Sequence, residues 1–225
     1  MQILKTCKTM VADGTFRVCP KLYKQVYIVH EVDSEGTALP LIYALLPNKQ
    51  ENTYMRFFTA LSRKMDDVGI GKNVVVDFEG NPIKAVRLAF PRAHVFACLF
   101  HLSKSIQRNM SHALDERYDE DINTEIQVRR LAALSFLPPS EVQSLFATIR
   151  SKVPRSDKDM LALYSYFEQT YIGTLSDRPD YPVQLWSSFY KVTNDIPRTS
   201  NIAESFNRKL NWSAACDHPS LWNFI

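Results

Sequence analysis

Apolar and polar residues along the first part of the chain follow a pattern that is typical of β-strands. Residues 9–16, 25–32 and 38–46 form three runs rich in β-branched and apolar side chains. Asp33–Gly36 separates the second run from the third and has the composition of a tight turn. Because the connections are short, the pattern predicts three antiparallel strands in a meander.

The pattern then changes to a helical period, followed by short buried runs. Apolar residues in 54–65 recur at helical spacing and predict a helix. Val74–Asp77 begins with consecutive valines without alternation, which is typical of a strand buried on both faces. A short helix is expected over residues 82–88, and His94–Ala97 is a candidate for a further buried strand. The first half of the chain therefore reads as α/β.

The rest of the chain carries only helical patterns. We expect an α/β fold with an RNase H-like mixed sheet flanked by helices, and an all-α insertion before the last helix; this is an analogy of fold. The expected organisation is a first part of the core at residues 1–110, a helical insertion at 111–195, and a C-terminal helix at 196–225 that completes the core.

Composition narrows the class of protein. The chain has 225 residues, of which 45% are hydrophobic and 23% charged, so it can bury a core and is not of the disordered class. A net charge of +3 permits nucleic-acid binding without requiring it. The four cysteines are scattered without a CxxC pair, which predicts free thiols in a reducing, intracellular compartment. No apolar run is long enough to span a bilayer, so we expect no membrane partner.

Three carboxylates stand where one site would need them. Asp13 and Asp77 each follow a predicted strand, and Glu204 lies on the last predicted helix. If the fourth strand runs parallel beside the first, both aspartates emerge at the same edge of the sheet. Carboxylate oxygens are the ligands that Mg²⁺ and Mn²⁺ prefer. Two such ions roughly 4 Å apart can activate an attacking hydroxyl and stabilise the leaving oxygen of a phosphodiester.

Each carboxylate also has a local interpretation that is the commoner one for a single residue. Asp13 precedes Gly14, a pair that is typical of turns. Asp77 ends a strand and can cap the next helix. Asn201 and Glu204 fit a capping box, with Asn201 as the cap. The shared site is favoured because all three positions fall where it would require them.

Cys98 and His101 have the spacing of half a zinc site. A structural zinc site normally has four ligands, and no second pair of this kind lies nearby. The alternatives are a small buried residue for Cys98 and a hydrogen-bonded core histidine for His101. Candidate DNA contacts, which can equally be solvated surface groups, are Arg198, Asn201, Arg208 and Lys209. The last two share a helix with Glu204.

Taken together, a series of short motifs resembles the Mutator-like element (MULE) transposase domain, a member of the DDE transposase superfamily, along nearly the whole chain. In chain order the motifs are Asp13–Phe16, Tyr43–Pro47, Thr53–Tyr54, Asp77–Glu79, Phe90–Pro91, Cys98–His101, Tyr171–Gly173 and Arg198–Asn201 with Glu204.

The resemblance implies an RNase H-like fold interrupted by a helical insertion. It matches Asp13 and Asp77 to the two aspartates of the family, Glu204 to its glutamate, and Cys98 and His101 to its CxxH motif near the active site. The implied reaction is cleavage of DNA at element ends followed by strand transfer, with two Mg²⁺ or Mn²⁺ ions. The implied partners are transposon ends and target DNA in the nucleus. The resemblance leaves open whether the chain forms a homo-oligomer.

Two other functions remain open from the sequence. Family members usually carry an N-terminal zinc-type DNA-binding module, and this chain begins shortly before Asp13. The alternative is therefore an inactive or domesticated transposase-derived domain that binds DNA or protein. A third interpretation is an RNase H-like nuclease acting on RNA or RNA–DNA hybrids, which would use the same metal chemistry.

Overall fold

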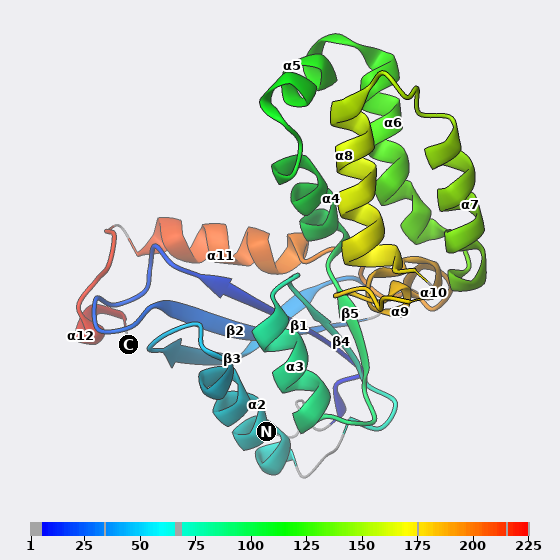
Figure 1. Cartoon of the computed structure of the whole chain (residues 1–225). Helices are drawn as coiled ribbons and strands as arrows, with labels where there is room; N and C mark the ends of the chain where they lie inside the picture. Colours follow the sequence, from blue (N-terminus) through cyan, green and yellow to red (C-terminus); the bar gives the residue numbers. More distant parts are fainter. Residues whose placement is uncertain (1–5, 34, 66–68, 175, 215, 225) are drawn as a thin grey trace. The chain divides into compact units, whose positions relative to one another are not determined.

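The computed structural model describes residues 6–33, 35–65, 69–174, 176–214 and 216–224, apart from the side chain of residue 202. The chain divides into two compact units. The first unit combines the chain up to residue 98 with the segment from residue 199 onward, and the second unit spans residues 99–198. The first unit contains a sheet and its flanking helices, and the second unit is helical (Figure 1).

The first unit is built on a five-stranded mixed sheet with the order β3-β2-β1-β4-β5. Its strands are β1 (Thr9–Thr15), β2 (Gln25–Val32), β3 (Ala38–Leu46), β4 (Asn73–Val76) and β5 (His94–Ala97). Its helices are α2 (Glu51–Met65), α3 (Gly80–Ala89), α11 (Asn201–Ser213) and α12 (Leu221–Phe224). These strands confirm the runs predicted from the sequence.

The sheet changes direction at β1. On one side, β2 pairs antiparallel with β1 and β3 pairs antiparallel with β2, as the short connections predicted. On the other side, β4 pairs parallel with β1 and β5 pairs parallel with β4. Parallel neighbours require a crossover, and α2 and α3 provide the crossovers that lead into β4 and β5.

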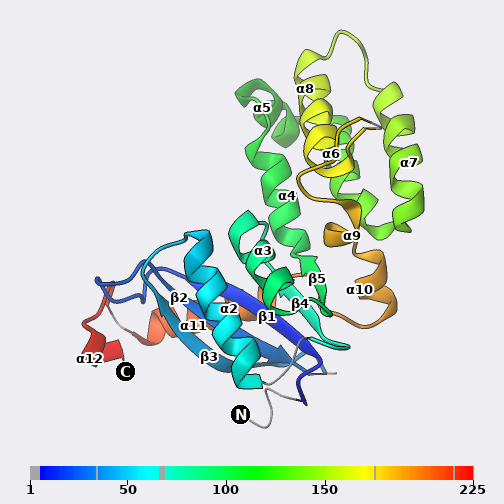
Figure 2. The same cartoon turned by 60° about the horizontal axis from the view of Figure 1, so that its bottom comes forward.

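Helices cover both faces of the sheet, and the alternation along β2 shows how. α2 and α3 pack on one face, and α11 packs on the other (Figures 1 and 2). Val26 and Ile28 of β2 point to the face of α11. Tyr27, between them, packs edge-on against Tyr54 and Phe58 of α2, with ring centroids 5.3 and 6.0 Å away. This double cover explains why the β4 valines are buried on both sides.

The second unit consists of helices around an aromatic core. Its elements are α4 (Leu99–Arg108), α5 (His112–Glu120), α6 (Ile122–Ala133), η1 (Leu134–Phe136), α7 (Pro139–Ser151), α8 (Lys158–Phe167), η2 (Glu168–Ile172), α9 (Val183–Trp186) and α10 (Phe189–Thr193). Trp186 is fully buried and its indole N–H points to the carbonyl oxygens of Tyr171 and Tyr181, 3.3 and 3.1 Å away. No helix in the described ranges is long and apolar enough to cross a bilayer.

The compact units divide at positions that differ from the boundaries expected from the sequence. The sequence placed the first part of the core at residues 1–110 and its completion at 196–225. In the structure α4 falls in the helical unit, because it packs against α6 and buries Leu102 and Ile106 there. The amphipathic pattern of α4 is compatible with either unit. It indicates that one face of the helix is buried, but it does not indicate which neighbouring element buries that face.

One buried histidine of the first unit makes stability depend on pH. His30 of β2 is fully buried, with its ring 5.2 Å from that of Phe206 of α11. Burial lowers the pKa of His30 from 6.5 to about 4. As the pH falls from 6.5 to 4, the unfolded chain therefore binds a proton that the folded protein does not. The free energy of unfolding decreases over that window.

We predict that His30→Leu flattens this dependence. Between pH 6.5 and pH 4.5 the wild type should lose more unfolding free energy than the variant, by on the order of 2 kcal/mol. Urea denaturation at the two pH values measures the difference, and titrating carboxylates cancel because both proteins contain them. Equal losses in the two proteins would show that His30 is already protonated or exposed in the folded state.

Candidate active site

The three parallel strands end in a row of residues that can carry chemistry. The last residues paired between β1, β4 and β5 are Ala12, Val76 and Ala97. The next residue on each strand is Asp13, Asp77 and Cys98, respectively, and we call these three the strand-end row. The backbone N–H of Cys98 donates to the carbonyl of Val76 at 3.0 Å, so the ladder continues into the row. Because neighbouring strands lie about 4.8 Å apart, its members are neighbours at one edge of the sheet.

Asp13 points to the face of the sheet that α11 covers. Val11 is paired with Val75, and Asp13 and Asp77 each follow two residues later. Side chains two residues apart on a strand share a face; Asp13 lies within β1 and Asp77 directly follows β4, so the register predicts the same face for both. Asp13 lies opposite Ile28 of β2, which packs in an apolar cluster with side chains of α11. The Asp13 carboxylate therefore projects toward α11.

Helix α11 crosses the strand-end row and is held at both ends of the crossing. Near its middle, the Nδ2 of Asn207 donates to Oδ2 of Asp13 at 2.7 Å. At its start, the backbone N–H of Ser200 donates to Sγ of Cys98 at 3.2 Å. Seven residues of helix rise about 10 Å, which equals about two strand spacings. The helix thus contacts the residue after β5 at its start and the end of β1 near its middle.

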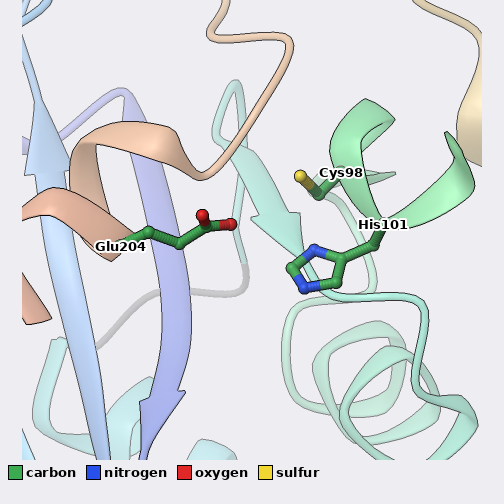
Figure 3. A group of neighbouring side chains, drawn as sticks. All are labelled: Cys98, His101 and Glu204. Carbon is green, nitrogen blue, oxygen red and sulfur yellow. The ribbon is translucent and has the colours of Figure 1, made fainter. Parts of the chain in front are cut away.

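Glu204 lies between these two contacts on the same side of the helix. It follows Ser200 by four residues and precedes Asn207 by three, and such positions share one helix face. Its Oε1 lies 3.0 Å from the hydroxyl of Ser200, and a carboxylate oxygen lies within 4.8 Å of Sγ of Cys98. Figure 3 shows the Glu204 side chain directed from α11 toward Cys98. The Ser200 hydroxyl also lies 3.3 Å from that sulfur, so its single proton serves one of them at a time.

Asp13 is buried, with 5% of its surface exposed, and lies inside β1. The strand continues to Thr15, so the turn that Asp13 and Gly14 suggested is not formed. Each carboxylate oxygen accepts a hydrogen bond, Oδ1 from the backbone N–H of Gly14 at 2.8 Å and Oδ2 from Asn207. At Gly14 the backbone passes close to a side chain of β2, because a Cβ would lie 2.5 Å from Oε1 of Gln25.

The helix-capping alternatives for Asp77 and Glu204 are not what the structure shows. The residue before α3 is Glu79, and its carboxylate pairs with Nζ of Lys49 at 2.7 Å. Asn201 is the first residue of α11, and the residue before that helix is Ser200. A capping box with Asn201 as its cap would need α11 to begin one residue later.

Two tyrosines lie beneath the strand-end row, on the face that α2 covers. Burial raises the pKa of Tyr27 well above its usual value, and the negative charges of Asp77 and Asp13 raise that pKa further. Burial raises the pKa of Tyr54 to about 12, and its hydroxyl accepts from Nε2 of Gln25 at 2.7 Å. Both phenols stay protonated at neutral pH, so they add no charge next to the aspartates.

The remaining candidate residues fall on both units. His101, also drawn in Figure 3, lies in the first turn of α4, in the second unit. Arg198 is the last residue of the second unit, where its guanidinium lies 5.9 Å above the ring of Phe136. The others are exposed on α11, namely Asn201, Arg208 and Lys209.

Two residues of the crossing were missed from the sequence, Asn207 and Asn211. The Oδ1 of Asn211 accepts from the hydroxyl of Thr15 at 3.2 Å and from the backbone N–H of Val18 at 3.0 Å. Together with Glu204 they form a polar stripe at helical spacing along α11. That stripe was a usable signal, because a helix that buries polar side chains in line must pair them with polar partners.

The oxygens of this site suit a hard divalent cation. Asp13, Asp77 and Glu204 supply carboxylates, which are the preferred ligands of Mg²⁺ and Mn²⁺. Asn207 is 5% exposed, and its Oδ1 is buried and accepts no hydrogen bond from any residue in the described ranges. A buried oxygen in that state is costly unless it meets a donor or a cation. The kinds of ligand atom in these side chains therefore agree with the ions that the sequence led us to expect.

One model of a known protein family matches part of the chain. Residues 9–105 match the family model of the MULE transposase domain. The matched segment runs from β1 into α4 and contains Asp13, Asp77, Cys98 and His101, whereas Glu204 lies beyond it. No curated protein matches the chain. Over residues 9–105, the chain is therefore similar to the MULE transposase domain family.

Proposed function

We propose that the chain is the catalytic core of a DDE-type DNA transposase with an RNase H-like fold, in which the second unit is a helical insertion. The observation that carries the proposal is the crossing of α11 over the strand-end row. Glu204 lies on α11 between the contact of Ser200 with Cys98 and the contact of Asn207 with Asp13, which supports a position for Glu204 near the strand-end row. The family match at residues 9–105 supports a transposase-related function independently of this geometry.

In this proposal Asp13, Asp77 and Glu204 hold two Mg²⁺ or Mn²⁺ ions. When bound, such ions favour deprotonation of an attacking water or 3′-hydroxyl and stabilise the leaving oxygen of the phosphodiester. The chain's own residues orient the reactants. The sheet fixes the two aspartates through the paired strands, and α11 brings the third carboxylate to them from the other side. The buried position of Asp13 limits the access of bulk water to that carboxylate.

DNA is the proposed partner, both as transposon ends and as target. Asn201, Arg208 and Lys209 are exposed on α11 and would contact phosphates beside the site. Arg198, in the second unit, is a separate candidate for a phosphate contact. A substrate of this kind lies on chromosomes, so we propose a nuclear location. Joining two element ends to one target would use more than one copy of the chain, which makes a homo-oligomer part of the proposal.

One contact favours a second function, a non-catalytic core that binds DNA or protein. Oε1 of Glu204 already lies 3.0 Å from the Ser200 hydroxyl, and its carboxylate lies within 4.8 Å of the Cys98 thiol. A carboxylate that is engaged in this way must be released in part before it can hold an ion. Metal binding therefore separates the two functions.

We predict saturable Mn²⁺ binding to the purified protein and an affinity at least about tenfold lower in Asp77→Asn. The substitution removes a charged ligand and keeps the size of the side chain. Isothermal titration calorimetry measures both affinities. Glu79→Gln is the matched control, because Glu79 lies two residues further on and pairs with Lys49, so its loss should leave Mn²⁺ affinity unchanged. A folded wild type that binds no Mn²⁺ would favour the non-catalytic function.

A second prediction concerns the reaction itself. With Mn²⁺ the wild type should nick supercoiled plasmid DNA. Asp13→Asn, Asp77→Asn and Glu204→Gln should each lower the rate by about three orders of magnitude, as expected for residues that act as one unit. Circular dichroism checks that the variants are folded. Metal binding without nicking in the wild type would contradict catalysis by this chain alone, and nicking at an undiminished rate by any variant would remove that residue from the site.

A third prediction concerns DNA binding by α11. The double variant Arg208→Ala/Lys209→Ala should bind DNA more weakly and with a shallower dependence on salt, because each lost phosphate contact lowers the slope of log affinity against log salt by about 1. Fluorescence anisotropy with a labelled duplex measures that slope. Lys84→Ala is the control, since Lys84 is also exposed but pairs with Glu51 on α2. Equal slopes for the wild type and the double variant would place the DNA elsewhere.

A further inference from the structure

Two asparagines, one turn apart on α11, face the same edge of β1 but meet different partners. Asn207 donates to the Asp13 carboxylate, at 2.7 Å. Asn211 bonds the Thr15 hydroxyl and the backbone N–H of Val18. Both fasten the helix to the sheet, and only Asn207 touches a residue of the strand-end row. The pair therefore separates a residue that acts on the site from one that anchors the helix.

We propose that Asn207 is the positioning residue that fixes the Asp13 carboxylate for cation binding and ties it to Glu204. A carboxyl group rotates over a broad range about its last side-chain torsion. In Asp13 the N–H of Gly14 binds one oxygen and Nδ2 of Asn207 binds the other, so the plane of the group is set from the strand and from the helix together. Hydrogen bonds of this kind to a ligating carboxylate orient it toward the metal.

The second oxygen of the amide extends this role. With Nδ2 directed to Asp13, Oδ1 of Asn207 is buried and accepts no hydrogen bond from the described part of the chain. A hydrated divalent cation held by Asp13 brings water molecules whose hydrogens can meet this oxygen. Asn207 would then donate to the ligand and accept from the water, which an aspartate or a leucine of similar size cannot do.

The position of Asn207 also links the two carboxylates mechanically. Glu204 lies three residues earlier on the same face of α11, so the rotation of the helix that satisfies Asn207 also sets the direction of Glu204. Loss of the Asn207 bond should therefore loosen the site at two ligands at once. The inference rests on the proposed metal site and goes further by naming a residue that no carboxylate motif includes.

The test compares Asn207→Leu with Asn211→Leu in Mn²⁺ calorimetry, at a temperature where circular dichroism shows both variants folded. Both variants should melt at a lower temperature than the wild type in EDTA, because each loses bonds between α11 and β1. Asn207→Leu should bind Mn²⁺ about 10- to 100-fold more weakly, whereas Asn211→Leu should stay within about threefold of the wild type. Plasmid nicking by Asn207→Leu should recover at high Mn²⁺ concentration, and nicking by Asp77→Asn should not.

The outcomes distinguish this inference from the proposed function. Wild-type affinity in Asn207→Leu, or an equal loss of affinity in the two asparagine variants, would overturn the assignment and leave the metal site standing, because Asn207 would then act as a helix anchor at most. A wild type that binds no Mn²⁺ would overturn the metal site, and the assignment would fall with it.

Discussion

The site depends on the register of the parallel pair β1 and β4. Val11 lies beside Val75, and this register predicts that Asp13 and Asp77, each two residues later, are neighbours on one face. A slip of one residue between the strands would turn one aspartate toward α2, into the aromatic layer around Tyr27. The valines of β4 resist such a slip because they are packed from both sides. Core packing therefore does the first part of assembling the site, before any polar contact forms.

Helix α11 completes the assembly with two different faces. Phe206 and Leu210 pack on the apolar cluster of β2, which holds the helix against the sheet. Glu204, Asn207 and Asn211 form the polar stripe that faces the end of β1 and its neighbours. The apolar contacts hold the helix against the sheet and change little when the helix rotates slightly, because the hydrophobic effect is non-directional. Hydrogen bonds of 2.7 to 3.2 Å depend on direction, so small rotations of the helix weaken them. The apolar face of α11 therefore stabilises its packing on the sheet, and the polar face fixes the rotation of the helix.

The strands and the three candidate carboxylates could be predicted from the sequence, whereas the contacts of these residues could not. Alternation in residues 9–46 and the valine run of β4 reveal strands because burial dictates those patterns locally. The neighbourhood of Asp13 and Asp77 followed only on the condition that β4 lies parallel beside β1, which the structure shows. The partner of Asn207 could not be predicted, because helical spacing tells which residues share a face and not which strand end that face meets. The assignment of α4 to the second unit could not be predicted for the same reason.

The division of the first unit between two stretches of chain has a consequence for synthesis in the cell. Asp13 and Asp77 are translated early, and the helix that carries Glu204 follows only after the entire second unit. A nascent chain can thus pair its strands before α11 is available to cover the face of the sheet on which Asp13 lies. Translation order therefore delays the contact between Asn207 and Asp13 until the helical unit has been made. A ribosome that stalls within that unit would release a polypeptide whose sheet lacks the helix that covers Asp13.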